Sequence, residues 1–161
     1  MQVLDHAVAW PIARRDIHHE CGPHQVAGVL RSRGIEAGIE ALYASSLHRY
    51  GDWMLPMDPP LVLARYGIRA RWRFWLAGSF IKNLKRALDA KHPILITIRS
   101  IQGTGCLHWI SAWGYEGDTF YCYDSQCESA EGERGNVVYS ASRLLAAIPW
   151  RGTFVTRMGQ E

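Results

Sequence analysis

Three residues of this sequence, Cys21, His108 and Asp124, carry the side chains that thiol acyl transfer requires. In that chemistry a thiolate attacks a carbonyl carbon, an imidazole moves the proton, and a carboxylate holds the imidazole in one tautomer and orientation. The three residues are far apart along the chain, so the fold must bring them together. The sequence elements around each of them indicate how it could do so.

The segment after Cys21 predicts a helix over residues 22–33. Its apolar residues recur at helical spacing, at Val26, Val29 and Leu30. Cys21 would then lie at the positive end of the helix dipole, beside unpaired backbone N–H groups, which favours the thiolate and provides a donor to an oxyanion. Gly22 lacks a side chain, so we expect it to let a substrate backbone approach the sulfur.

His108 and Asp124 are placed on consecutive predicted strands, residues 107–115 and 119–123, around the turn Glu116-Gly117-Asp118. A three-residue turn pairs Ile110 with Asp124. His108 and Asp124 then share one face of the hairpin as diagonal neighbours, whereas a shift of one residue would place them on opposite faces.

The remaining pattern predicts an α+β protein with the helices first and a mainly antiparallel sheet after them. The further helices are expected over residues 35–50, 60–66, 79–91 with Ser79 as the N-cap, and 140–148, and the further strands from residue 69 and over 93–98 and 152–156. No repeat or linker divides the sequence, so residues 1–161 are expected to form a single domain.

Arginines alternate with apolar residues from position 69, at Arg69, Arg71 and Arg73. A two-residue period is typical of a half-buried strand, so Ala70, Trp72 and Phe74 are expected to face the core and the arginines to face water. A basic stripe that binds nucleic acid is the sharper alternative. The solvated face is the favoured interpretation, and no nucleic-acid partner is expected.

In three short motifs the sequence resembles the C39 and C39-like peptidases of the papain-like clan, the bacteriocin-processing type. These are ECGP at residues 20–23 with the apolar helix after it, LHWI at 107–110 with Gly114-Tyr115, and YDS at 123–125. The resemblance implies a papain-like fold and peptide-bond hydrolysis through an acyl-enzyme, with Cys21 as the nucleophile, His108 as the proton carrier and Asp124 as the orienting group. It implies a peptide or protein substrate, and a separate exporter is a candidate partner.

The family pattern also has a glutamine six residues before the cysteine, where its side-chain amide serves the oxyanion. Position 15 here is arginine. Arg15 is therefore the oxyanion candidate, because a guanidinium can donate hydrogen bonds, and His18 and His19 are alternatives.

Three other functions remain open on the sequence alone. The same triad could transfer an acyl group to an acceptor other than water, the fold could bind peptides without cleaving them, or Cys106, Cys122 and Cys127 could hold a structural zinc ion. The favoured interpretation requires no metal and no cofactor.

Composition agrees with a globular protein, with 48% hydrophobic and 20% charged residues and a net charge of +3. No apolar run has the length of a membrane span, and the N-terminus lacks a signal-peptide pattern. We therefore expect a soluble cytoplasmic protein without stable membrane insertion, with export by a signal-less route left open.

Overall fold

The computed structural model describes residues 2–3, 21–46, 54–100, 106–125, 127 and 137–159. Within these ranges the helices are α1 (Cys21–Arg31), α2 (Ile39–Ala44), α3 (Asp58–Arg65), α4 (Ala77–Asp89) and α5 (Ala141–Ala147). The strands are β1 (Gln2–Val3), β2 (Ala70–Leu76), β3 (Ile94–Arg99), β4 (Leu107–Glu116), β5 (Thr119–Asp124), β6 (Val137–Ser140) and β7 (Gly152–Met158).

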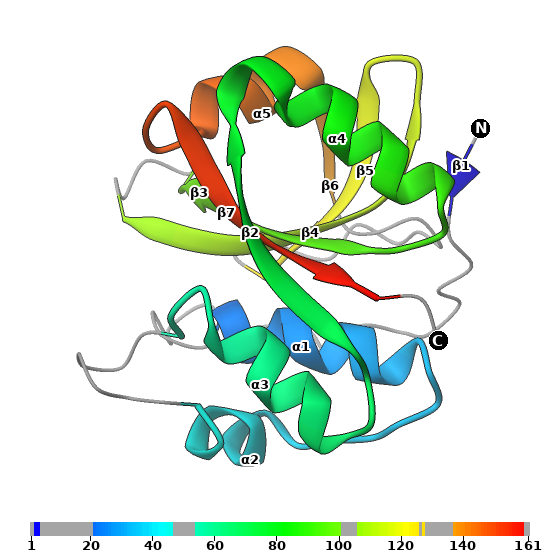
Figure 1. Ribbon diagram of the computed structural model, residues 1–161, viewed down its shortest axis with the longest axis vertical. Coiled ribbons are helices and arrows are strands. Elements are labelled where there is room, and N and C mark those ends of the chain that lie inside the picture. The colour runs from blue at the N-terminus through cyan, green and yellow to red at the C-terminus, as the bar shows by residue number, and fades with distance from the viewer. Residues whose placement is uncertain are drawn as a thin grey trace.

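All strand pairings in the described chain are antiparallel, and they form one sheet in the order β2-β7-β3-β4-β5-β6, with β1 paired to β4. Helices α1, α2 and α3 lie on one side of this sheet, and α4 and α5 lie on the other (Figure 1). The expected α+β class with an antiparallel sheet is confirmed.

Most expected elements are present with boundaries shifted by a few residues. The helix expected over 35–50 is shorter in its described part, since α2 runs from Ile39 to Ala44. Ser79 is not the N-cap of α4, because the helix follows directly after β2 and Leu76 takes the cap position; the Ser79 hydroxyl donates to the Leu76 carbonyl. Strands β1 and β6 were not expected, since two and four residues are too short for a periodic signal.

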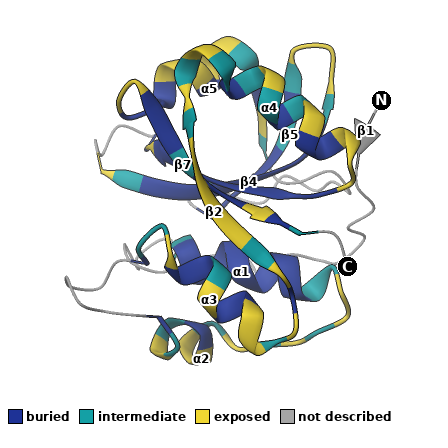
Figure 2. Cartoon of the chain, in the orientation of Figure 1, coloured by how far each residue is buried: buried dark blue, intermediate teal, exposed yellow. Residues whose placement is uncertain are grey.

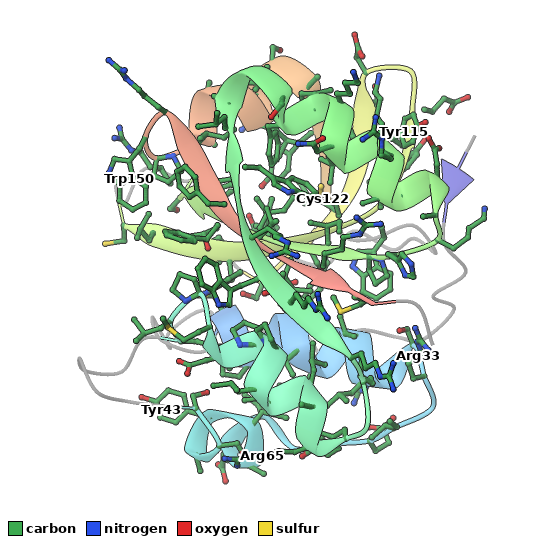
Figure 3. All side chains as sticks on the ribbon, in the orientation of Figure 1. Arg33, Tyr43, Arg65, Tyr115, Cys122 and Trp150 are labelled. Atoms are coloured by element: carbon green, nitrogen blue, oxygen red, sulfur yellow. The ribbon has the colours of Figure 1, made fainter. Side chains whose placement is uncertain are left out.

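The buried residues concentrate on β3, on β4, on α1, where every residue from Gly22 to Leu30 is buried, and on the inner face of α4 (Figure 2). Strand β2 differs, because it forms an edge of the sheet and pairs only with β7. Its arginines are exposed as expected, but Trp72 and Phe74 are also 46% and 44% exposed, so the expectation that they face the core was wrong. An edge strand with no helix fully covering it leaves both of its faces partly in water.

The β4–β5 hairpin has the expected register but not the expected turn. Ile110 does pair with Asp124, but Glu116 pairs with Thr119, so the turn holds only two residues, and Gly117 has a φ of 58°. That turn alone would have paired Ile110 with Ser125. A β-bulge between Ala112 and Gly114 adds one residue to β4 and restores the pairing.

Candidate active site

Cys21 is the first residue of α1, as the motif predicted, and its side chain is partly buried. Gly22 beside it is fully packed: a Cβ atom built there would lie 2.6 Å from Met54 Cβ. The expected role of Gly22 is therefore corrected. Its missing side chain makes room for Met54, which precedes α3, and not for a substrate backbone.

A buried polar network joins α1 to β4. The Ser111 hydroxyl donates to Gln25 Oε1 at 2.6 Å, and Gln25 Nε2 donates to the Trp109 carbonyl at 3.3 Å. The indole of Trp113 donates to Ser111 Oγ at 2.7 Å. Because buried polar groups keep stable positions only when they are paired, this network fixes the helix that carries Cys21 against the strand that carries His108.

Met54 makes a second link between the same two elements. Its backbone carbonyl accepts a 3.0 Å hydrogen bond from Trp109 Nε1 while its side chain packs on Gly22. Gln25 and Met54 were both missed as positioning residues. A glutamine among the apolar positions of a helix was the available signal for the first, and the sequence carried none for the second.

His108 and Asp124 are almost completely buried, at 2% and 1% exposed, and lie on the same face of the hairpin. The His108 Nε2 atom is 2.6 Å from Asp124 Oδ1. Since an ionised carboxylate can only accept, Nε2–H is the donor, and Nδ1 is left for another partner. Nδ1 has no hydrogen bond of standard geometry among the described residues.

The electrostatics of His108 also involve Cys21. Burial lowers the pKa of His108, but interactions with the Asp124 carboxylate and the Cys21 sulfur outweigh it and raise the pKa from 6.5 to about 9. The imidazole is therefore largely protonated at neutral pH. The structure thus places His108 in direct contact with Asp124, and the Cys21 sulfur close enough to the imidazole to contribute to its raised pKa.

Tyr139 on β6 is a further member that the sequence did not reveal. It is 2% exposed, and its hydroxyl donates to Asp124 Oδ2 at 2.8 Å, so both carboxylate oxygens are engaged. Burial and the neighbouring Asp124 charge raise the pKa of Tyr139, which keeps the phenol protonated as a donor. Finding Tyr139 required the strand β6, which sequence periodicity had not shown.

An apolar hollow with a volume of about 210 Å³ opens beside His108. It is lined mainly by Met54, Leu55, Pro56, Trp109, Trp150 and Phe154. Trp109 was expected to pack in the core and not to line the cleft; it is 4% exposed and does both. A cavity of this size and polarity fits one apolar side chain.

The other cysteines occupy three different environments: Cys106 is exposed, Cys122 is fully buried and Cys127 is partly buried. In the described part of the chain no three metal-ligating side chains come together, so the ligand set of the zinc alternative is not assembled there. No helix in that part is both long and apolar enough to span a membrane. Arg15, His18 and His19 lie outside the described residues.

No protein-family model and no curated protein sequence matches the chain. Several solved structures, in contrast, are similar to the chain. The peptidase domain of Streptococcus ComA, a bifunctional ABC transporter of a quorum-sensing pathway, superimposes with a TM-score of 0.67 at 16% identity, over 94% of this chain and 100% of that one.

Two further structures superimpose over a similar extent. A double glycine motif protease from an AMS/PCAT transporter, solved with its leader peptide, gives a TM-score of 0.63 at 16% identity, over 93% of this chain and 91% of that one. A Bacillus anthracis protein described as C39-like gives 0.65 at 14% identity, over 100% and 99%. The chain therefore has the papain-like fold of the C39 peptidase domains, as its motifs had suggested.

Proposed function

We propose that the protein is a cysteine peptidase with Cys21 as the nucleophile, His108 as the proton carrier and Asp124 as the orienting group. The observation that carries the proposal is the position of His108, which donates from Nε2 to Asp124 at 2.6 Å and also interacts with the Cys21 sulfur. A thiol at a helix start, an imidazole beside it and a buried carboxylate behind the imidazole form a nucleophile, base and orienter.

The reaction follows from the protonation state of His108. With a pKa near 9, the imidazole carries two protons at neutral pH, which supports a thiolate on Cys21 beside it. The sulfur attacks the scissile carbonyl, and His108 Nδ1 then donates its proton to the leaving amine as the acyl-enzyme forms. The neutral imidazole next takes a proton from water, which hydrolyses the thioester.

The negative oxygen of the tetrahedral intermediate needs donors. The backbone N–H at the start of α1 is one, because the first N–H groups of a helix have no partner within it. We propose Arg15 as the second. Its replacement by alanine should then lower kcat without lowering the free energy of unfolding, and Arg15→Gln, which restores an amide, should support hydrolysis at least as well as the wild type. Unchanged kcat in Arg15→Ala would exclude this role.

The apolar hollow beside His108 supports a peptide as the proposed substrate class. A peptide that places its scissile bond at Cys21 can insert one apolar side chain between Met54, Trp150 and Phe154. The solved complex of a similar protease with a leader peptide supports a peptide as the occupant. A separate exporter is a further proposed partner, since two of the similar structures are peptidase parts of transporters.

Competitive alkylation tests the nucleophile. Cys106 is the matched control because it is more exposed than Cys21 but is not linked to His108. After a brief iodoacetamide pulse at neutral pH, mass mapping should find Cys21 modified before Cys106, and His108→Gln should abolish that preference. Faster modification of Cys106 in the wild type would contradict the proposal.

Hydrolysis tests the reaction. A library of short peptides with varied apolar residues should be cleaved by the wild type and not by Cys21→Ala. Transfer of the acyl group to an added amine in preference to water would identify an acyltransferase. Peptide binding without any turnover, together with an unreactive Cys21, would identify a binding module.

A further inference from the structure

A second, strongly basic hollow lies at the other end of the sheet. It has a volume of about 630 Å³ and is lined chiefly by Arg69, Arg71, Arg73, Arg157 and His92. His92 lies two residues before β3, whereas Ile98 near the end of β3 pairs with His108. Six residues of extended chain separate the two hollows by roughly 20 Å.

In the absence of a ligand, the arginines of this hollow repel one another and so reduce the stability of the sheet. Arg71 on β2 and Arg157 on β7 are direct partners in the ladder, and like charges facing each other across strands destabilise a sheet. No carboxylate occurs among the described residues of the lining. None of its four arginines forms an ion pair with a carboxylate of the described residues.

His92 gives an independent indication of a missing partner. It is 8% exposed, and both of its ring nitrogens are buried without a hydrogen-bond partner among the described residues. Buried polar atoms in native proteins are nearly always paired, so an unpaired imidazole in the wall of a cavity points to a ligand. Burial and the charges of Arg157 and Arg33 lower the pKa of His92 and keep it neutral, a state that an anion would reverse.

We propose that this hollow binds a phosphate-bearing polyanion, held by Arg71 and Arg157 beside His92. A carboxylate offers two coplanar oxygens and satisfies one guanidinium, whereas phosphate groups offer oxygens in several directions and can bridge the two opposed arginines. The described residues of the lining include no Phe, Tyr or Trp ring that could stack on a base. The recognised chemistry is therefore the phosphate chain itself, either free or as part of a nucleotide.

Binding is measured by calorimetry with tripolyphosphate and ATP, with citrate as a carboxylate of comparable charge. We expect tripolyphosphate to bind, and Arg157→Gln and Arg71→Gln each to weaken it about tenfold, which corresponds to the loss of one charge-assisted contact. Arg86→Gln is the control, since it removes the same charge from an exposed position of α4 outside the hollow. Stronger binding of ATP than of tripolyphosphate would identify a nucleotide as the source.

Thermal unfolding supplies a second readout. Arg157→Gln should raise the Tm of the ligand-free protein, because it removes the repulsion with Arg71, and should reduce the increase in Tm that tripolyphosphate causes. An arginine with only a structural role would lower the Tm instead. NMR titration of the histidines should show a higher pKa for His92 when tripolyphosphate is added. The positive charges of Arg33, Arg69 and Arg73 are the same in both titrations, so the bound anion accounts for the difference.

Three results would overturn the inference. Equal weakening by Arg86→Gln would reduce the effect to general surface charge. Citrate binding as tightly as tripolyphosphate would remove the preference for phosphate. Binding of a single-stranded oligonucleotide or an acidic peptide without any binding of tripolyphosphate would assign the hollow to a macromolecule. None of these measurements depends on peptide hydrolysis, so the inference and the proposed function fail separately.

Discussion

The two ends of the sheet differ in whether their charged and polar side chains have partners. At one end His108 is 2% exposed, and its partner Asp124 has both carboxylate oxygens engaged, by His108 and Tyr139. At the other end His92 is 8% exposed and has no hydrogen-bond partner among the described residues, and Arg71 is the ladder partner of Arg157. The first end is electrostatically complete except toward Cys21, and the second has no carboxylate counter-charge among its described residues. A polar group whose hydrogen bonds are all made within the protein keeps one fixed geometry. A cluster of like charges without a counter-charge is instead stabilised when a ligand of opposite charge binds.

Removing the negative charge of Asp124 should have the largest effect of the substitutions considered, and the quantity affected is kcat. Asp124→Asn keeps the shape of the side chain but loses the carboxylate that fixes the His108 tautomer, and in related triads such a change lowers kcat by about 10⁴-fold. The steady-state rate on a cleaved peptide measures this. Rates within tenfold of the wild type would show that Asp124 does not orient the base.

The two histidines should respond differently to pH. Because folding raises the pKa of His108 from 6.5 to about 9, its contribution to stability is complete below pH 6.5 and is lost as the pH rises through 9. The free energy of unfolding should therefore fall by about 3 kcal/mol across that window. Urea titrations at several pH values would measure the fall.

Substitution of each histidine shows which of the two causes this loss of stability. His108→Gln should abolish the decrease between pH 6.5 and 9, whereas His92→Gln should retain it, because the His92 pKa is shifted in the opposite direction. A decrease that persists in His108→Gln would assign the titration to another group.

A smaller effect is expected from the hydroxyl of Tyr139. Tyr139→Phe leaves Asp124 Oδ2 buried without that donor, which should cost about 1–3 kcal/mol of the free energy of unfolding. Tyr121→Phe is the matched control, since the Tyr121 hydroxyl donates to exposed Glu116 at 3.2 Å, and its loss should cost under about 0.5 kcal/mol. Equal losses in the two variants would mean that Tyr139 adds nothing specific to the carboxylate.

The smallest effect is expected at the incomplete end and has the opposite sign. Arg71→Gln should stabilise the ligand-free protein by about 0.2–1 kcal/mol, because it removes a like-charged pair on adjacent strands. Chemical denaturation at low ionic strength measures this, and added salt should shrink the difference. Destabilisation would indicate that the arginine stem packs usefully on the strand.

The sequence predicted those parts of the fold that depend on local periodicity. The helix after Cys21 and the β4–β5 hairpin follow from spacing that a short window contains, and they placed the main side chains of the site. Gln25, Met54 and Tyr139 could not be placed in this way. Each acts through a contact with a distant segment, such as the 2.6 Å hydrogen bond between Ser111 and Gln25.

The hairpin shows the same limit in another form. Its register was predicted correctly from a three-residue turn, but the structure has a two-residue turn and a bulge. The two descriptions give the same pairing of Ile110 with Asp124, so the pattern of strand residues could not distinguish them. The edge position of β2, which exposes Trp72, also depends on strand order and not on the strand's own sequence.

The bulge in β4 has a consequence for how this chain can change in evolution. The side of the hairpin on which Asp124 emerges depends on the combined residue count of turn and bulge. Insertion or deletion of one residue between His108 and Asp124 would move the carboxylate to the opposite face, unless a second length change compensated for it. Length variants among relatives should therefore arise in pairs, with a longer turn accompanied by the loss of the bulge.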